Sequence, residues 1–461
     1  MRLVRLVVAL LLTYSAAACS ATTTSAPTES TATPGKAEPC TTISGFTCTT
    51  LRVPLDHRKP DGEQLELPVA AADNADAPRG VLLMLTGGPG QPGVALVPQV
   101  RPYLDPAVLS EYRLVMFDQR GTGTNGINCP ELQRAVGGSD FLTPPADAVD
   151  ACARVFGPRI DFYGTPDTVE DIELLRRSLG ADRLTLDGTS YGSFTAAQYG
   201  LKYPDHVRSL VLDSVVPHRG FDPFSIDLMN HTADVLTATC RRDPACTTDP
   251  VADLAWLVRH GELDGAPLNG TDLIESLAIL SLNSVNPSFD GIPKVLHDAR
   301  NADTAALKEL IQRATSLGAG HDELSAGLHL ATLCSDLRFP WSAADPPAER
   351  VAALESAVRA LDDARLHPYD VRTARNQLAI EGCLRWPSTR SSAYPAAQEL
   401  LPRTLILHGS NDLFCPLSWA EWERDHARQA QLVVVPGSGH GVQGNRTDPT
   451  GRAQVRAFLL G

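Results

Sequence analysis

The sequence predicts an α/β protein with a mostly parallel sheet, helices on both faces of the sheet and an inserted helical cap domain. Short apolar runs rich in β-branched residues alternate with amphipathic helical stretches from about residue 40 onward. A long helical block interrupts this alternation, and strand-like runs return near the C-terminus. With 461 residues, 43% of them hydrophobic, the chain can bury one large core or two smaller ones.

Residues 1–18 predict an export signal, because Arg2 and Arg5 precede a short apolar stretch that ends in small residues. A cysteine follows directly, as in a bacterial lipobox, so we expect Cys19 to carry a lipid; ordinary secretion is the alternative. Residues 19–39 are rich in Thr, Ser and Pro and predict a flexible tether. We therefore expect an exported protein that is either anchored to the cell membrane or secreted.

The order of the apolar runs divides the remainder into an α/β core interrupted by a cap. The core comprises residues 40–217 and 401–461, and the cap comprises residues 218–400. Predicted core strands cover 46–57, 65–74, 80–86, 112–119, 183–188, 209–216, 403–412 and 431–441, and core helices cover 168–180 and 191–204. The cap sequence is helical at 227–240, 253–260, 271–280, 304–314, 321–334 and 346–361, with no strand expected between them.

Ser190 is the predicted nucleophile. It lies in GTSYG, between a predicted strand and a predicted helix, with Gly188 and Gly192 two residues to either side. A strained strand-to-helix turn needs small flanking residues because the neighbouring chain segments approach too closely for a Cβ atom. The pattern alone is common, but this context favours a nucleophile elbow over an ordinary turn serine.

A serine hydroxyl needs a base, and that base is best an imidazole held by a carboxylate. Asp412 and His440 each follow a predicted C-terminal strand and complete the chain order serine, acid, histidine. Asp213, at the end of the strand after the elbow helix, is the alternative acid. His408 is interpreted as a packed histidine and Asp187 as a structural carboxylate.

Two N–H groups are predicted to form an oxyanion hole: those of Tyr191, directly after the nucleophile, and Gly88, in the loop TGGPGQPG. This loop also matches the GxGxxG pattern of nucleotide-binding proteins, as does the segment 121–126. Neither loop opens a helix or leads to a strand-end acid about twenty residues later, and two prolines remove donors from the first loop. We therefore expect no nucleotide and no other cofactor.

The ten cysteines indicate an oxidising compartment. Plausible disulfides are 40/48, 129/152, 240/246 and 334/383, which leaves Cys415 unpaired, although spacing alone does not determine connectivity. No CxxC or HExxH motif occurs, so no metal is expected. The formal charge of −14 and the absence of a basic run argue against nucleic acid as a partner.

The chain resembles α/β hydrolases of the proline iminopeptidase and tripeptidyl aminopeptidase group, of the secreted actinobacterial type. The resemblance rests on these segments: GGPG at 87–90, FDQRGTG at 117–123, TVEDIELLRRSLG, the stretch from GTSYGS to SVVP, CSD at 334–336, CLRWP at 383–387, SNDLFCP and GSGHG. It implies an α/β-hydrolase fold and supports the triad and oxyanion residues named above. It also suggests that Asp336, in CSD, binds a substrate ammonium group; a packing carboxylate is the alternative. Cys415 stands where this group usually has Thr.

The predicted function is that of an exported serine aminopeptidase, of prolyl or tripeptidyl type, which cleaves amide bonds near free peptide N-termini through an acyl-enzyme. A carboxylesterase or lipase-like hydrolase with the same triad is the alternative, and an inactive binding scaffold is a third class that the complete triad disfavours. We expect a monomer whose only membrane contact is the lipid at Cys19.

Overall fold

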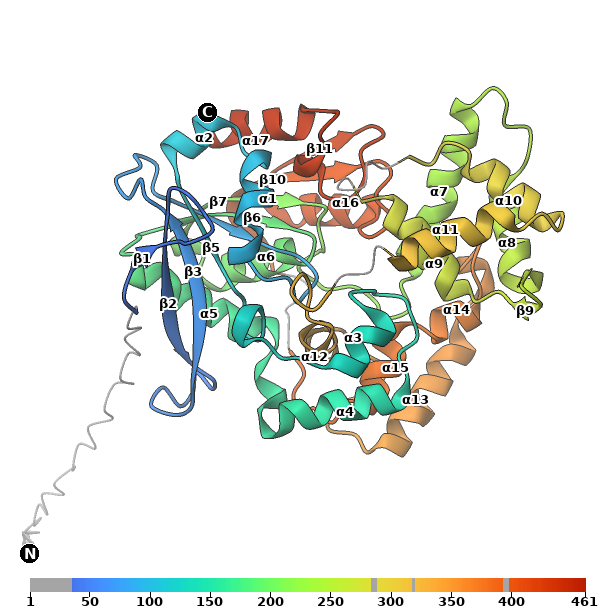
Figure 1. The fold of residues 1–461 in the computed structure, drawn as a ribbon, viewed down its shortest axis with the longest axis horizontal. Helices are drawn as coiled ribbons and strands as arrows, with labels where there is room; N and C mark the ends of the chain where they lie inside the picture. Colours follow the sequence, from blue (N-terminus) through green and yellow to red (C-terminus); the bar gives the residue numbers. More distant parts are fainter. Residues whose placement is uncertain (1–34, 283–287, 317–319, 393–397) are drawn as a thin grey trace, which may run out of the picture. The chain divides into compact units, whose positions relative to one another are not determined.

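The computed structural model describes residues 35–282, 288–316, 320–392 and 398–461 (Figure 1). The predicted export signal, Cys19 and most of the tether lie outside these ranges. Glu38–Pro39, at the end of the predicted tether, forms β1 and pairs with β2, next to the disulfide between Cys40 and Cys48. Within the four ranges, no helix is long and apolar enough to span a bilayer.

The centre of the fold is a nine-stranded sheet in the order β1-β2-β3-β5-β4-β6-β7-β10-β11. The pairs β1–β2, β2–β3 and β3–β5 are antiparallel. The pairs β5–β4, β4–β6, β6–β7, β7–β10 and β10–β11 are parallel, so the predicted mostly parallel sheet is confirmed. The bounds are β1 Glu38–Pro39, β2 Phe46–Pro54, β3 Gln64–Ala72, β4 Val81–Leu85, β5 Arg113–Phe117, β6 Leu184–Thr189, β7 Val207–Asp213, β10 Leu400–Gly409 and β11 Ala427–Val435.

Helices cover both faces of this sheet because successive side chains of a buried strand point to opposite sides. In β4, Leu83 and Leu85 pack into one apolar cluster with α5, α6 and α16, whereas Leu82 and Met84 pack into another with α1, α2 and α17 (Figure 1). The bounds are α1 Val97–Val100, α2 Pro106–Glu111, α5 Thr165–Ser178, α6 Tyr191–Lys202, α16 Leu417–Asp425 and α17 Thr450–Leu460.

The predicted cap sequence forms a series of helices whose apolar residues make up most of one cluster, here called the cap core, which also includes Tyr191, Phe194 and Trp419 of the α/β core. Their bounds are α7 Ile226–Arg242, α8 Pro250–His260, α9 Gly270–Leu280, α10 Ile292–Arg300, α11 Ala305–Ser316, α12 Ala326–Asp336, α13 Pro347–Ala360, α14 Val371–Arg375 and α15 Leu378–Arg385. The expectation of no strand is wrong for one hairpin, β8 (Glu262–Leu263) with β9 (Ala266–Pro267). Strands of two residues are too short to give a periodic sequence signal.

The cap core also includes a segment that precedes the nucleophile. Helices α3 (Pro130–Val136) and α4 (Ala146–Phe156) contact α12 and α15, and their apolar residues belong to the same cluster as those of the cap. The disulfide 129/152 joins α4 to the start of α3, and 334/383 joins α12 to α15. All four expected disulfides form, and Cys415 is the free cysteine of the described residues.

Candidate active site

Ser190 lies in a sharp turn between β6 and α6, with φ 58° and ψ −129°. An L-residue reaches this conformation only under strain, and tight packing of the turn holds it there. A Cβ atom on Gly188 would lie 2.2 Å from the carbonyl oxygen of Gly192, and one on Gly192 would lie 2.3 Å from that of Leu85. Both glycines are therefore required for the turn, as the sequence predicted.

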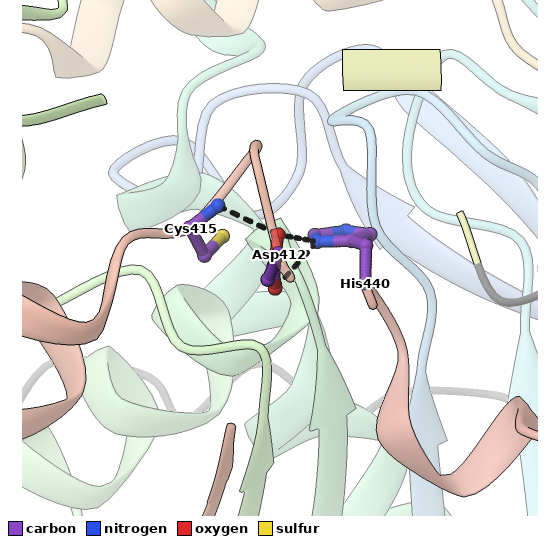
Figure 2. A group of neighbouring side chains, drawn as sticks. All are labelled: Asp412, Cys415 and His440. Atoms are coloured by element: carbon purple, nitrogen blue, oxygen red, sulfur yellow. Dashed lines mark hydrogen bonds and ion pairs between the residues drawn. The ribbon is translucent and has the colours of Figure 1, made fainter. Parts of the chain in front are cut away.

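Asp412 and His440 come together from the loops after β10 and β11 (Figure 2). The Nδ1 of His440 lies 3.0 Å from each carboxylate oxygen of Asp412. Oδ1 of Asp412 also accepts the backbone N–H groups of Phe414 and Cys415, at 2.9 and 3.0 Å. Burial alone would raise the pKa of Asp412, but the charge and hydrogen bond of His440 and the N–H of Cys415 lower it to about 2.

The imidazole of His440 is held by Asp412 through Nδ1. Because a carboxylate only accepts hydrogen bonds, Nδ1 carries the proton toward Asp412 and Nε2 remains the acceptor. Burial opposes charging of the imidazole, but the charge of Asp412 outweighs it and raises the pKa of His440 above its ordinary value. The backbone N–H of His440 donates to the carbonyl of Ser281 in the cap, at 2.7 Å. The cap therefore contacts the loop that carries the base.

Asp213, the alternative acid, bonds to backbone groups of the loop that carries His440 and not to the His440 ring. Its carbonyl oxygen accepts the N–H of Ser190 at 2.9 Å, and its carboxylate accepts the N–H groups of Val442 and Gln443, each at 2.8 Å. Asp213 thus connects the nucleophile turn to the histidine loop. Burial raises its pKa to about 6.

The two residues interpreted as structural are both buried. Asp187 accepts a hydrogen bond from the side chain of Gln443 at 2.9 Å. His408 is fully buried, and neither ring nitrogen has a hydrogen-bond partner among the described residues. Burial lowers its pKa to about 4, so His408 is a neutral packed histidine.

The loop TGGPGQPG runs beside the nucleophile. A Cβ atom on Gly87 would lie 2.8 Å from the Cβ of Ser190, so only glycine permits this approach. The Gly87 N–H is already bound to the side chain of Gln91. Gly88 and Tyr191 both line the pocket at Ser190, and their N–H groups have no acceptor within the described ranges. The sequence predicts these two N–H groups as the donors of an oxyanion hole.

A cap histidine supports this loop from behind. His329, in α12, is buried, and its Nδ1 donates to the carbonyl oxygen of Pro89 at 2.8 Å. The N–H of Ser325, the N-cap residue of α12, donates to the carbonyl of Gly90 at 3.0 Å. Nε2 of His329 lies 2.9 Å from the carboxylate of Asp140. Burial disfavours the imidazolium, but pairing with Asp140 raises the pKa of His329 overall.

Asp336 does not lie where the resemblance suggested. It is 2% exposed and is absent from the lining of the Ser190 pocket. Its carboxylate accepts the Thr165 N–H at the start of α5, the Tyr191 hydroxyl at 2.8 Å and the Ser392 hydroxyl at 2.7 Å. These bonds leave no open face for a substrate, so the ammonium assignment is corrected to a packing role beneath Tyr191.

The pocket at Ser190 has a mostly apolar lining with a few polar residues. Its apolar lining includes Phe141, Val216, Phe221, Leu228, Phe414 and Trp419. Asp140, in the loop between α3 and α4, is the carboxylate that lines it. Its side chain is 34% exposed. Sequence reasoning missed Asp140, because it belongs to no motif and reaches the pocket only through packing of the cap.

Comparison with known proteins identifies the class. Residues 80–245 match a family model described as alpha/beta hydrolase fold, and residues 368–461 match one described as TAP-like protein. The chain is 25% identical to a tripeptidyl aminopeptidase of Streptomyces lividans over 453 residues, covering 90% of this chain and 81% of that protein. It is 25% identical to serine protease Hip1 of Mycobacterium tuberculosis over 462 residues, covering 90% and 85% of the two chains. A proline iminopeptidase of Xanthomonas citri is 34% identical over 141 residues, which covers 31% of this chain and 34% of that protein.

The chain is therefore an α/β hydrolase. Within that class it belongs to the group with a TAP-like C-terminal region, and it is a serine hydrolase of the peptidase type.

Proposed function

We propose that the chain is an aminopeptidase in which Ser190 is the nucleophile, His440 the general base and Asp412 the residue that orients the base. Nε2 of His440 takes the hydroxyl proton as Oγ of Ser190 attacks the carbonyl carbon of the scissile amide. The same proton then passes to the leaving amine, which departs with the C-terminal part of the peptide. Water, activated by His440, hydrolyses the acyl-enzyme and restores Ser190.

The negative charge that develops on the substrate oxygen needs preorganised donors. The N–H groups of Gly88 and Tyr191 supply them, because both residues line the Ser190 pocket and neither N–H is bound to another part of the described chain. An oxyanion hole of this kind serves amides and esters alike, so it supports a hydrolase without deciding the substrate.

The position of Asp140 is the observation that favours a peptide substrate with a free N-terminus. It places a partly exposed carboxylate on the wall of an otherwise mostly apolar pocket. A carboxylate there favours a cationic group on the acyl side of the substrate, and a peptide ammonium is such a group. Oδ1 of Asp140 is paired with His329, so Oδ2 is the oxygen assigned to the substrate.

The four disulfides are typical of a protein that folds in an oxidising compartment outside the cytoplasm. We propose in addition that Cys19 is lipidated, which would attach the enzyme to the cell membrane through the tether. Intact-mass analysis of the detergent-extracted protein tests this proposal. A diacylglyceryl mass on a chain that begins at Cys19 would support it, and an unmodified N-terminus would contradict it.

The function is tested with paired substrates. Unblocked aminoacyl, prolyl and tripeptidyl chromogenic amides are compared with their N-acetylated forms and with short-chain aryl esters. The proposal predicts cleavage of one class of unblocked amide and at least about a tenfold lower kcat/KM after acetylation, since an ion pair with Asp140 is lost. Ser190→Ala is the inactive control.

Asp140→Asn gives the residue-level test. It should lower kcat/KM for the unblocked amide and leave the acetylated amide and the aryl ester nearly unchanged. Asp182→Asn, at an exposed aspartate in the turn before β6, is the matched control. Cleavage of esters alone would support the esterase alternative. If Asp140→Asn lowered kcat/KM for the unblocked and the acetylated amide by the same factor, this result would contradict the assignment of Asp140 to the substrate ammonium group.

A further inference from the structure

Cys415 adds a third ligating atom to the acid and base of the site. Its Sγ, a carboxylate oxygen of Asp412 and a ring nitrogen of His440 all lie within 4.8 Å of one another (Figure 2). We propose that these three side chains form a binding site for a zinc-type divalent cation, which inhibits the enzyme when bound. Thiolate, imidazole and carboxylate together suit zinc, which accepts three protein ligands and leaves a fourth position open. The sequence motifs for zinc did not reveal this cluster because its ligands come from two separate loops.

Only a small movement is needed to form the site. Zinc bonds of about 2.0–2.3 Å place two ligands of one tetrahedral ion roughly 3.3–3.8 Å apart. Nδ1 of His440 already lies 3.0 Å from both oxygens of Asp412. The Cys415 sulfur, at no more than 4.8 Å from the other two ligand atoms, needs to approach by about 1 Å.

Asp412 has an oxygen available for the ion. Among the described residues, Oδ1 accepts the backbone N–H groups of Phe414 and Cys415 and also lies 3.0 Å from Nδ1 of His440, whereas Oδ2 contacts only Nδ1 of His440. Coordination of the ion by Oδ2 and by Nδ1 of His440 therefore replaces the contacts of Nδ1 with both oxygens and keeps the two backbone hydrogen bonds to Oδ1. The two N–H groups would then hold the carboxylate in place, as outer hydrogen bonds do in established metal sites.

The surroundings attract a cation and give it access. Asp412 and Asp140 both place negative charge close to Cys415. Cys415 also lines the same pocket as Ser190, so an ion in this pocket would lie next to Cys415. The fourth coordination position would face that pocket and hold a water molecule.

The binding step explains the inhibition. Zinc replaces the proton of the Cys415 thiol, which is released to solvent, and a Zn–S bond forms. Zinc also takes the place of the proton on Nδ1 of His440, and that proton moves to Nε2. An Nε2 that carries a proton cannot accept the proton of Ser190, so the general base is lost while the imidazole stays neutral. This inhibition rests on the proposed role of His440, but binding of the ion does not.

The test measures binding and inhibition separately. Zinc chloride is titrated calorimetrically into the full mature chain, with any affinity tag removed, in a buffer that does not chelate metals. We expect one zinc ion per wild-type chain and unchanged binding by Ser190→Ala, which has no role as a ligand. Cys415→Ser should weaken zinc binding by at least about 100-fold, more than loss of an outer hydrogen bond to a metal ligand costs. The zinc concentration for half-inhibition, relative to each variant's own zinc-free rate, should rise by a similar factor.

Controls keep the result specific. Cys19→Ser, which changes a cysteine outside the four described disulfides, should bind zinc as the wild type does. Magnesium and calcium at the same concentrations should not inhibit, because they prefer oxygen ligands. Cobalt-loaded wild-type enzyme should show a thiolate-to-metal charge-transfer band that Cys415→Ser and Cys415→Thr lack.

Equal zinc binding by wild type and both Cys415 variants, or no zinc binding, would overturn the proposal. Zinc binding without inhibition would confirm the site and contradict the role of His440 instead.

Discussion

Nδ1 of His329 lies 2.8 Å from the carbonyl oxygen of Pro89, so a buried histidine of the cap holds the loop that carries Gly88. We predict that His329→Ala lowers kcat by about 10–100-fold with a smaller change in KM, because a misplaced donor weakens the transition state more than the bound substrate. Steady-state kinetics test this split. His260→Ala, at an exposed histidine of α8, is the control. If KM instead rose by about this factor while kcat stayed unchanged, His329 would act on substrate binding and not on the transition state.

Gly88 offers a second test of the oxyanion loop. Its φ is +107°, and a Cβ atom would lie 2.8 Å from the nitrogen of Gly90. Gly88→Ala should therefore shift the N–H donor and lower kcat by about 10²–10³-fold, the usual cost of losing one oxyanion donor. Gly45→Ala is a matched control, since Gly45 also has a positive φ of +77° but open space around it. Gly45→Ala should lose some stability and keep its kcat. A similar loss of kcat in both variants would contradict a specific role of Gly88 in the oxyanion loop.

The charge of Asp412 predicts a specific change in pH dependence. Although burial opposes it, Asp412 raises the pKa of His440, and only the neutral imidazole can act as base. Activity of the wild type should therefore fall as pH decreases through this raised pKa. In Asp412→Asn the favourable charge is gone, so the pKa of His440 falls and the acidic limb of the kcat/KM profile moves to lower pH. The rate itself should fall by about 10⁴-fold. An acidic limb at the same pH in both enzymes would assign it to a different group.

The disulfide between Cys334 and Cys383 joins α12 to α15, and its partners are 49 residues apart. In the chain-entropy model its removal lowers the free energy of unfolding by about 4 kcal/mol, against about 2 kcal/mol for a loop of six residues. The pair Cys240 and Cys246, six residues apart, is the matched comparison. Urea unfolding of the two double alanine variants should show the larger loss for the first pair. A larger loss for the second pair would contradict the entropic account.

The parallel sheet, the nucleophile-type turn at Ser190 and the pairing of Asp412 with His440 could be predicted because their signals are local. The glycines around Ser190 stand at fixed offsets in one turn, and Asp412 and His440 each end an apolar strand. Ser190 needs no distant partner to be recognised as a candidate nucleophile.

The rest of the site depends on contacts between distant segments. Asp140 and His329 are 189 positions apart, carry no motif and meet only because α12 packs over the loop after α3. Asp336 was placed wrongly for the same reason: its motif is local, but its partners Thr165, Tyr191 and Ser392 come from three other segments. Residues that act through the cap therefore required the structure.

We propose that Ser190 is the nucleophile of a working triad. The most direct measurement is to inactivate the enzyme with a fluorophosphonate and to locate the adduct by peptide mass spectrometry. We expect one adduct per chain, on Ser190, formed in proportion to the loss of amidase activity and much more slowly in His440→Ala. An adduct on another residue, or full activity of a chain modified at Ser190, would contradict it.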